Sequence, residues 1–357
     1  MKKLFFLMLI FLILPINIQA FTTSAECGIL MDQNSNRIIY EKNIHKVKSV
    51  ASISKIMTAI LAIESNKLED IVVIDDEVLK AYGSAVYLKI GEQISLLDLV
   101  YGLMLRSGND AALAIAKYVA LDVDEFVELM NQKAKLIGMK KTTFNNPSGL
   151  DNEKGNYSTV YDMALLTSYA MKNDIYRKIT GTKRHVVKTN MNVYEWINKN
   201  KLLTLYKNAT GGKTGFTEIA KRTLVTTASK DGLDLVSVTL NDGNDFYDHQ
   251  ALFEEGFETY KNYKILMADK INILNESYYK RPFYLKNSFN YPLLEIEIDN
   301  IYLKFKLEKK RFYEDGDQVG LVKVILGDEE IYEDAIYISK GEVKKKNKFL
   351  SWFKSLW

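Results

Sequence analysis

The chain has 357 residues, of which 47% are hydrophobic and 26% are charged, and its formal net charge is +3. These values describe an ordinary globular protein with room for one large and one smaller domain, and they exclude a largely disordered chain. Acidic and basic residues are interspersed along most of the chain, so no extended basic surface, and hence no nucleic-acid partner, is expected.

Residues 1–20 have the order of a secretory signal peptide. Lys2 and Lys3 precede an unbroken apolar run over residues 4–14, and Ala20 is a small residue suited to cleavage. The 11 apolar residues would make a helix of about 17 Å, whereas a bilayer core is about 30 Å thick. We therefore predict an exported protein from which residues 1–20 are removed, rather than a membrane-spanning helix at this position.

The next segment, residues 21–263, is predicted to form one α+β domain. A β-hairpin is expected first, with strands at Gly28–Asp32 and Arg37–Glu41. Apolar residues at helical spacing then predict helices at Ser52–Ser65, Leu97–Leu105, Ala111–Tyr118, Asp124–Met139 and Asp162–Met171. An Asp-Gly hairpin turn is expected between the strands Thr223–Ala228 and Leu233–Leu240, before a closing helix at Glu254–Tyr263. Because strands flank the helices, the terminal strands are expected to pair in one antiparallel sheet.

From about residue 264 onward the pattern becomes all-β. Alternating apolar and polar residues predict strands at Leu293–Ile298, Ile301–Leu307, Val319–Leu326 and Ala335–Ile338. Residues 264–340 contain no cluster of candidate catalytic groups. We therefore interpret them as a small β-sandwich domain that acts as a spacer.

The last segment, residues 341–357, is a basic and amphipathic tail. It contains five lysines against one acidic residue, Glu342, and large apolar residues recur at spacings of three and four after Lys348. Such a segment is suited to lie on an anionic membrane surface. We predict that residues 344–357 hold the exported protein at the outer face of the cytoplasmic membrane.

Three short motifs in a fixed order carry the chemical information. They are Ser52-Ile53-Ser54-Lys55, Ser107-Gly108-Asn109 and Lys213-Thr214-Gly215. The patterns S-x-x-K and S-x-N recur elsewhere in the chain, so each alone means little, whereas Lys-Thr-Gly occurs once. The order of the three, in compatible structural contexts, is what makes them informative.

The first motif offers a serine nucleophile with a lysine as its base. None of the 3 histidines lies in a catalytic context, whereas Lys55 lies one helical turn after Ser52. An unperturbed lysine has a pKa of about 10.4, whereas a useful base at neutral pH needs a pKa of about 7 to 8. This difference in pKa corresponds to a free energy of roughly 4 kcal/mol. A helix end supplies at most about 1 kcal/mol. We therefore expect a dry pocket in which the Lys55 and Lys213 ammonium groups both face Ser52.

The remaining motif residues suggest further roles. Ser107 can relay a proton toward a leaving amine, and the Asn109 amide can orient either the substrate backbone or Lys55. Lys213 and Thr214 suit a substrate carboxylate, as a charge and a hydroxyl donor. The backbone N–H groups of Ser52 and Phe216 are the candidate donors for a tetrahedral oxyanion.

The ordered motifs resemble the set of low-molecular-weight penicillin-binding proteins, specifically serine-type D-alanyl-D-alanine carboxypeptidases. The resemblance covers roughly residues 27–340 and includes several other segments: Leu105–Ala111, Asn146–Asp151, Tyr157–Thr159 with Asp162, and Gly211–Thr217 with Ala220–Thr223. The last of these resembles the sporulation-type enzymes of spore-forming Gram-positive bacteria, which trim spore-cortex peptidoglycan.

The resemblance implies a penicillin-binding/β-lactamase-like transpeptidase domain followed by a small all-β domain. It makes Ser52 the acyl-ester nucleophile, Lys55 the proton acceptor, Ser107 the second-motif serine and Lys213 a substrate-binding residue. The implied substrate is a peptidoglycan stem peptide ending in D-Ala-D-Ala, the implied inhibitors are β-lactams, and no metal or cofactor is needed. Some relatives use an additional arginine for the terminal carboxylate, and residues 241–250 contain none.

Three alternative functions share these motifs. A β-lactamase of the most similar class would have an E-x-x-L-N segment between the second and third motifs, and Glu128-Leu129-Met130-Asn131 is one residue too short. A D,D-endopeptidase that cuts cross-links uses the same residues, and the sequence does not separate it from a carboxypeptidase. A non-catalytic muropeptide-binding scaffold would not require both Ser52 and Lys55.

Overall fold

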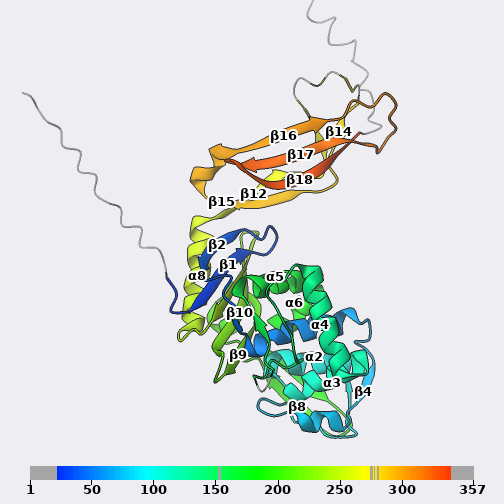
Figure 1. The fold of residues 1–357 in the computed structure, drawn as a ribbon, viewed down its shortest axis with the longest axis vertical. Helices are drawn as coiled ribbons and strands as arrows, with labels where there is room; N and C mark the ends of the chain where they lie inside the picture. Colours follow the sequence, from blue (N-terminus) through cyan, green and yellow to red (C-terminus); the bar gives the residue numbers. More distant parts are fainter. Residues whose placement is uncertain (1–21, 152–153, 274–275, 277, 280, 339–357) are drawn as a thin grey trace, which may run out of the picture.

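The computed structural model describes residues 22–151, 154–273, 276, 278–279 and 281–338. An α+β part comes first, and an all-β part follows it at the other end of an elongated molecule (Figure 1). This arrangement confirms the predicted fold class. The predicted signal peptide and the predicted membrane-associating tail lie outside the described residues. Within the described ranges, no helix has the length and apolar character needed to cross a membrane.

A five-stranded antiparallel sheet forms the centre of the α+β part. Its strands lie in the order β2 (Ile38–Lys42), β1 (Cys27–Asp32), β11 (Leu233–Leu240), β10 (Lys221–Lys230) and β9 (Ala209–Thr217). Strand β1 pairs with β11, so strands from both ends of this part share one sheet, as predicted. At the predicted hairpin turn, Asp231 and Gly232 have φ values of 51° and 78°, which the tight β10–β11 connection requires.

Helices pack on both faces of this sheet. The described helices of the whole α+β part, not all of which contact the sheet, are α1 (Lys55–Glu64), α2 (Leu96–Tyr101), α3 (Asn109–Ala120), α4 (Val123–Ile137), α5 (Val160–Met171), α6 (Asp174–Gly181), α7 (Leu202–Leu205) and α8 (Asp245–Thr259). In β1, Ile29 and Met31 belong to the core shared with α1 and α5, whereas Leu30 packs with Phe253 of α8. Side chains alternate between the faces of a strand, so β1 is buried along its whole length.

Short elements complete the α+β part. Three two-stranded ribbons pair β3 (Lys48–Ser49) with β6 (Tyr157–Ser158), β4 (Ile71–Val73) with β5 (Gln93–Ser95), and β7 (Arg184–Lys188) with β8 (Val193–Ile197). Short helical turns are η1 (Ala51–Ser54), η2 (Asp76–Lys80) and the π-helical η3 (Gly102–Arg106). None of the three ribbons was predicted from the sequence, because strands of two to five residues are too short to show a clear alternating pattern.

The predicted closing helix at Glu254–Tyr263 is wrong in its position, because α8 begins nine residues earlier, at Asp245, and ends at Thr259. The first half of α8 buries polar side chains. The two ring nitrogens of His249, which is fully buried, lie 2.5 Å and 2.9 Å from the hydroxyls of Thr226 and Thr239. A buried histidine is tolerated in a core when both of its ring nitrogens are hydrogen-bonded. Because histidine is polar, it does not contribute to the apolar periodicity from which the helix was predicted.

The all-β part contains two small sheets. The larger has the order β13 (Lys270–Ile271), β14 (Phe283–Tyr284), β18 (Glu329–Ile338), β17 (Gln318–Leu326) and β16 (Ile301–Leu307), and the smaller pairs β12 (Lys261–Leu266) with β15 (Phe289–Leu293). Leu266 and Phe289 of the smaller sheet share one apolar core with Val322 and Ile336 of the larger. Packing of two sheets over a common core is the arrangement of a sandwich.

The strand predicted at Leu293–Ile298 is wrong beyond its first residue. Residues Glu295–Asn300 form a 3₁₀ turn, η4, after β15 ends. Ile296 is 80% exposed, so the alternating apolar residues of this segment do not form the buried face of a strand. The Glu297 carboxylate instead accepts a hydrogen bond from the Leu294 N–H at 2.9 Å, which closes the turn.

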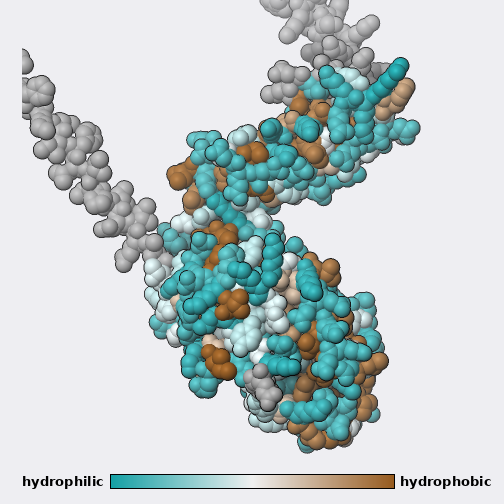
Figure 2. Space-filling model, viewed as in Figure 1, coloured by the Kyte–Doolittle hydropathy of each residue, from teal (hydrophilic) through white to brown (hydrophobic). Residues whose placement is uncertain are grey.

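Arg37 of the α+β part connects the two parts. Its guanidinium donates to the carbonyl oxygen of Pro292 and pairs with the Glu297 carboxylate, both at 2.5 Å. It also lies 5.0 Å from the ring centres of Tyr260 and Tyr291. The space-filling view shows the narrow waist that these contacts bridge, and its visible face is mostly hydrophilic, with apolar residues in small patches (Figure 2).

Candidate active site

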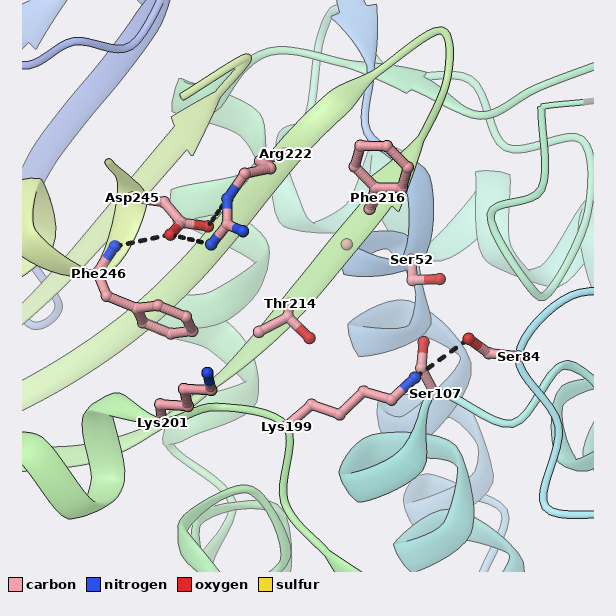
Figure 3. A pocket seen from close by; sticks show the side chains of 11 residues that line it. Ser52, Ser84, Ser107, Lys199, Lys201, Thr214, Phe216, Arg222, Asp245 and Phe246 are labelled. Atoms are coloured by element: carbon pink, nitrogen blue, oxygen red, sulfur yellow. Dashed lines mark hydrogen bonds and ion pairs between the residues drawn. The ribbon is translucent and has the colours of Figure 1, made fainter. Parts of the chain in front are cut away.

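The three sequence motifs meet in one pocket of the α+β part. The predicted side chains come from separate elements: Ser52 from η1, Lys55 from α1, Ser107 and Asn109 from the junction of η3 and α3, and Lys213 and Thr214 from β9. Figure 3 shows Ser52, Ser107 and Thr214 around the same opening. Helix α1 and strand β9 therefore bring together groups that are far apart in the sequence.

The Lys55 ammonium group lies fully buried behind the Ser52 hydroxyl. Its Nζ donates to Ser52 Oγ at 3.1 Å, to Asn109 Oδ1 at 2.7 Å, and to the carbonyl oxygen of Ser148. Because η1 runs directly into α1, residues three positions apart lie on the same side of the backbone. The predicted contact between Ser52 and Lys55 is therefore present.

The electrostatic environment favours the neutral form of Lys55. Burial, followed by the nearby ammonium groups of Lys213 and Lys199, lowers the pKa of Lys55 well below its usual value. Burial and Lys199 also lower the pKa of Lys213 to about 7. Lys213 was predicted from its motif as the second cation, whereas Lys199 was not, because the residues around it form no recognisable motif.

The second buried ammonium group contacts the second-motif serine. Lys213 Nζ donates to Ser107 Oγ at 3.0 Å and to the carbonyl oxygen of Thr214 at 2.7 Å. Both ammonium groups were predicted to face Ser52, whereas Lys213 contacts Ser107 instead. Ser107 has a left-handed backbone with φ 63°, which a non-glycine residue adopts only where surrounding contacts impose it.

The Asn109 amide is engaged on both sides within the protein. Its Oδ1 accepts from Lys55, and its Nδ2 donates to the carbonyl oxygen of Tyr82 at 2.6 Å. The neighbouring Asp110 carboxylate accepts backbone N–H bonds from residues 86–88 at 2.7–3.1 Å. In this structure Asn109 thus contacts Lys55, in keeping with the second of its two predicted roles. The contacts of Asn109 and Asp110 also hold the 82–88 segment beside the pocket.

Gly215 lets β9 approach the turn that carries Ser52. A Cβ at this position would lie 2.4 Å from Thr223 Oγ1 and 3.0 Å from the Ser52 backbone nitrogen, too close for any side chain. This close approach places the Ser52 N–H next to the strand segment that ends with Phe216 and Thr217. The two predicted oxyanion donors, at Ser52 and Phe216, therefore belong to adjacent backbone segments.

A loop with no predicted role supplies the third partner of Lys55. The Asn146 Oδ1 accepts from the N–H groups of Ser148 and Gly149, at 3.1 Å and 2.6 Å. Gly149 has φ 78°, and a Cβ there would lie 2.0 Å from the Ala51 carbonyl oxygen. The loop is thus pressed against η1, which places the Ser148 carbonyl at the Lys55 ammonium group.

The pocket has a volume of about 430 Å³ and contains further cations that the sequence analysis missed. Lys199 and Lys201 line it, and Lys199 Nζ donates to Ser84 Oγ at 3.1 Å. Arg222 also lines it, from β10, in an ion pair with Asp245 (Figure 3). Residues 241–250, where an additional arginine was expected, contain none, whereas Arg222 lies opposite Phe216 in the β9–β10 hairpin.

This arrangement has a definite chemical capacity. A hydroxyl next to an amine of lowered pKa is an activated nucleophile. The surrounding cations favour a ligand that carries a carboxylate. Among the described residues, no group of three or more His, Cys, Asp and Glu is placed to hold a metal ion.

Comparison with known proteins places these features in a family. The family model Peptidase_S11, described as D-alanyl-D-alanine carboxypeptidase, matches residues 16–244. The D-alanyl-D-alanine carboxypeptidase DacF of Bacillus subtilis (strain 168) is 34% identical over 220 residues, which are 60% of this chain and 56% of that protein. DacC of Escherichia coli (strain K12) is 34% identical over 267 residues, 71% of this chain and 66% of that protein. The matched part therefore spans less than two thirds of either relative.

A solved structure extends the likeness in fold to both parts of the chain. Penicillin binding protein 5 from Haemophilus influenzae superposes with a TM-score of 0.76 at 24% identity, covering 89% of this chain and 97% of that one. The family match, which covers more than half of the chain, and the converging motifs agree. The chain belongs to the Peptidase_S11 family of D-alanyl-D-alanine carboxypeptidases.

Proposed function

We propose that this protein is a serine D-alanyl-D-alanine carboxypeptidase that removes the terminal D-Ala from peptidoglycan stem peptides and so limits their cross-linking. The observation that carries the proposal is the 3.1 Å contact between Lys55 Nζ and Ser52 Oγ in a buried, cationic site. In this pairing the lysine amine, and not a histidine, activates the serine. The substrate class is inferred from membership of the family.

In the proposed reaction, neutral Lys55 takes the hydroxyl proton as Ser52 Oγ attacks the carbonyl carbon of the penultimate D-Ala. The Ser52 and Phe216 N–H groups would stabilise the oxyanion. Ser107, held by Lys213, would pass a proton to the departing amine of the last D-Ala. Water would then hydrolyse the acyl ester and restore the Ser52 hydroxyl.

The terminal carboxylate of the substrate is proposed to bind at Lys213 and Thr214. Lys199, Lys201 and Arg222 add positive charge to the same pocket. A β-lactam carries a comparable carboxylate next to a reactive carbonyl. It is therefore proposed to acylate Ser52 and to block the site.

The proposal includes a place of action. Residues 1–20 would direct export, and residues 341–357 would hold the mature protein at the outer face of the cytoplasmic membrane. The resemblance of residues 211–223 to sporulation-type enzymes supports a use in spore-cortex peptidoglycan. A protein that lacks residues 341–357 should leave the membrane fraction, and its retention there would refute the role of the tail.

The first test is labelling of residues 21–357 with a tagged penicillin, followed by mapping of the adduct by mass spectrometry. We expect a long-lived adduct on Ser52, and a loss of labelling by about a thousandfold or more in Ser52→Ala. Ser65→Ala, at the end of α1 and outside the pocket, is the matched control. Rapid penicillin turnover without an adduct would indicate a β-lactamase, and neither adduct nor turnover would indicate a non-catalytic scaffold.

A further inference from the structure

The Asp151 carboxylate joins two segments beside the pocket that contains Ser52. Its Oδ1 accepts a hydrogen bond from the Ser49 hydroxyl at 2.6 Å, and its Oδ2 accepts one from the Thr217 hydroxyl. Ser49 is the last residue of β3, three positions before Ser52, and Thr217 is the last residue of β9. One carboxylate therefore ties the segment that leads to Ser52 to the end of the neighbouring strand.

The contact of Ser49, Asp151 and Thr217, here called the carboxylate clamp, has little room to move. Ser49 is 4% exposed. The Thr217 hydroxyl oxygen also accepts from the Ala220 N–H at 3.0 Å. A Cβ at Gly155 would lie 2.6 Å from Asp151 Oδ1, so no side chain fits between that backbone and the carboxylate. Hydrogen bonds to an ionised acceptor are stronger than those between neutral groups, so the clamp is a firm connection.

The turn between Ser49 and Ser52 has a strained backbone. Ala51 has φ 48°, a left-handed conformation that is unfavourable for a residue with a Cβ. Such a conformation persists only where surrounding contacts impose it. On one side of the turn, the Val50 carbonyl oxygen accepts from the Thr223 hydroxyl of β10 at 3.1 Å. The carboxylate clamp holds the same turn at Ser49, so the two contacts together fix the backbone that presents Ser52.

The carboxylate clamp also lies next to both proposed oxyanion donors. These donors are the backbone N–H groups of Ser52 and Phe216. The first follows Ser49 by three residues, and the second directly precedes Thr217. The clamp therefore bridges the two backbone segments that carry the donors. Because such donors act only when they lie about 2.7–3.1 Å from the developing oxyanion, a change in the separation of the segments weakens the bond to one donor or to both.

We propose that Asp151 is a positioning residue for acyl transfer, whose carboxylate fixes the spacing between the Ser52 and Phe216 N–H groups. This inference rests on the proposed function and adds a residue that acts on the transition state through the backbone. Lys213 and Thr214, which are proposed to bind the substrate carboxylate, are not part of the clamp. Loss of the clamp should therefore slow the chemical step much more than it weakens initial binding.

The experiment follows acylation of residues 21–357 by a penicillin, with the dissociation constant of the initial complex and the acylation rate constant measured separately. Asp151→Ala should lower the rate constant about a hundredfold, as for loss of one oxyanion donor, and change the dissociation constant less than about twofold. Asp151→Asn can still accept from one hydroxyl and donate to the other, so its loss should be only about tenfold.

The pH dependence separates this role from an electrostatic one. Asp151 is not among the charges that alter the pKa of Lys55. The acid limb of the acylation rate should therefore stay in place in Asp151→Ala and in Asp151→Asn, although the rate itself falls. A shift of the acid limb in both variants would assign Asp151 an electrostatic role and overturn the inference.

Thr217→Val tests the same contact from the other side, because it keeps the shape of the side chain and removes the hydroxyl. It should lower the acylation rate constant about tenfold, and it should have no further effect in the Asp151→Ala background, where the bond is already absent. Asp124→Ala removes an exposed carboxylate from the first turn of α4 and is the matched control. It should be acylated like the unmodified chain.

The possible outcomes separate the inference from the proposed function. An unchanged rate constant in Asp151→Ala, or a loss confined to the dissociation constant, would overturn the inference and leave the carboxypeptidase in place. Losses that add in the double variant would show that Asp151 and Thr217 act separately. If Asp151→Ala does not fold, the rate constants of Asp151→Asn and Thr217→Val decide. No acylation of the unmodified chain would refute the proposed function, and the inference with it.

Discussion

Three ammonium groups determine the chemistry of the pocket. Lys55 and Lys213 are buried, and Lys199, which lines the same pocket, is half-buried. Each positive charge makes protonation of the others less favourable, and burial adds to the effect. A lysine whose pKa is lowered loses its proton more readily than an exposed lysine, which is the property that the proposed role of Lys55 as a base requires.

Removal of the Lys199 charge should shift the pH dependence of acylation. Because Lys199 contributes to the lowered pKa of Lys55, Lys199→Met should raise that pKa and leave more Lys55 protonated, and inactive as a base, at a given pH. We expect the acid limb of the penicillin acylation rate to move up by about one pH unit, the effect of a like charge a few ångströms away. The measurement is the second-order acylation rate from pH 5 to pH 9.

Lys201→Met is the control for this prediction. Lys201 lines the same pocket but is not among the charges that lower the pKa of Lys55. Its removal should alter the height of the profile more than its position. An acid limb that stays in place in Lys199→Met would contradict the electrostatic role of Lys199.

The contact between β9 and η1 positions Ser52, the proposed nucleophile. The strand supplies Lys213 and Thr214, and its glycine allows the turn that carries Ser52 to lie against it. The Asn146–Gly149 loop presses on the same turn from another side. Ser52 is thus held by neighbours on two sides, so the proposed nucleophile and the proposed oxyanion donors are already fixed in the unliganded protein.

Gly215→Ala should disrupt this contact. Its Cβ would lie within 3.0 Å of Thr223 Oγ1 and the Ser52 nitrogen, so β9 and η1 must separate. We expect the acylation rate to fall by roughly a hundredfold or more, as for loss of one oxyanion donor, with little change in circular dichroism. Gly243→Ala, where a Cβ meets nothing within 4 Å, should have no effect. Near-normal acylation of Gly215→Ala would contradict this account of the glycine.

The two parts of the molecule are coupled through Arg37. Its guanidinium, with 12% of the side chain exposed, joins the α+β part to Pro292 and Glu297 of the all-β part. Hydrogen bonds to a charged group in such a setting contribute about 1.5 to 3 kcal/mol. The orientation of the all-β part therefore depends on Arg37, together with the 2.6 Å hydrogen bond from Asn262 of β12 to the carbonyl oxygen of Gly232.

Arg37→Met should uncouple the unfolding of the two parts. We expect calorimetry to resolve a separate, earlier transition for the all-β part, and hydrogen exchange to increase in β12 and β15, while penicillin acylation is retained. Arg184→Met removes an arginine whose ion pair with Glu195 is exposed, 61% and 52% for the two side chains, and should change stability by less than about 1 kcal/mol. An unchanged single transition in Arg37→Met would show that the coupling lies elsewhere.

Much of the chain could be predicted because local chemistry determines it. The α+β order, the Asp-Gly turn and the Ser52 to Lys55 spacing follow from backbone geometry over a few residues. The start of α8 and the end of β15 could not. His249 contacts the hydroxyls of Thr226 and Thr239 on two other elements, and Glu297 pairs with Arg37, which is 260 residues away. In both cases a tertiary contact outweighs the local periodicity.

The sequence by itself determined the family resemblance and the candidate pair of Ser52 and Lys55, because these rest on residue types in a fixed order. Only the tertiary structure decided that Lys213 meets Ser107, that Asn109 holds Lys55, and that Lys199 and Arg222 join the pocket. Those residues come from separate helices, strands and loops, and their proximity depends on how these elements pack. The packing of these elements determines the distances between their side chains, and these distances cannot be read from the spacing of the residues along the chain.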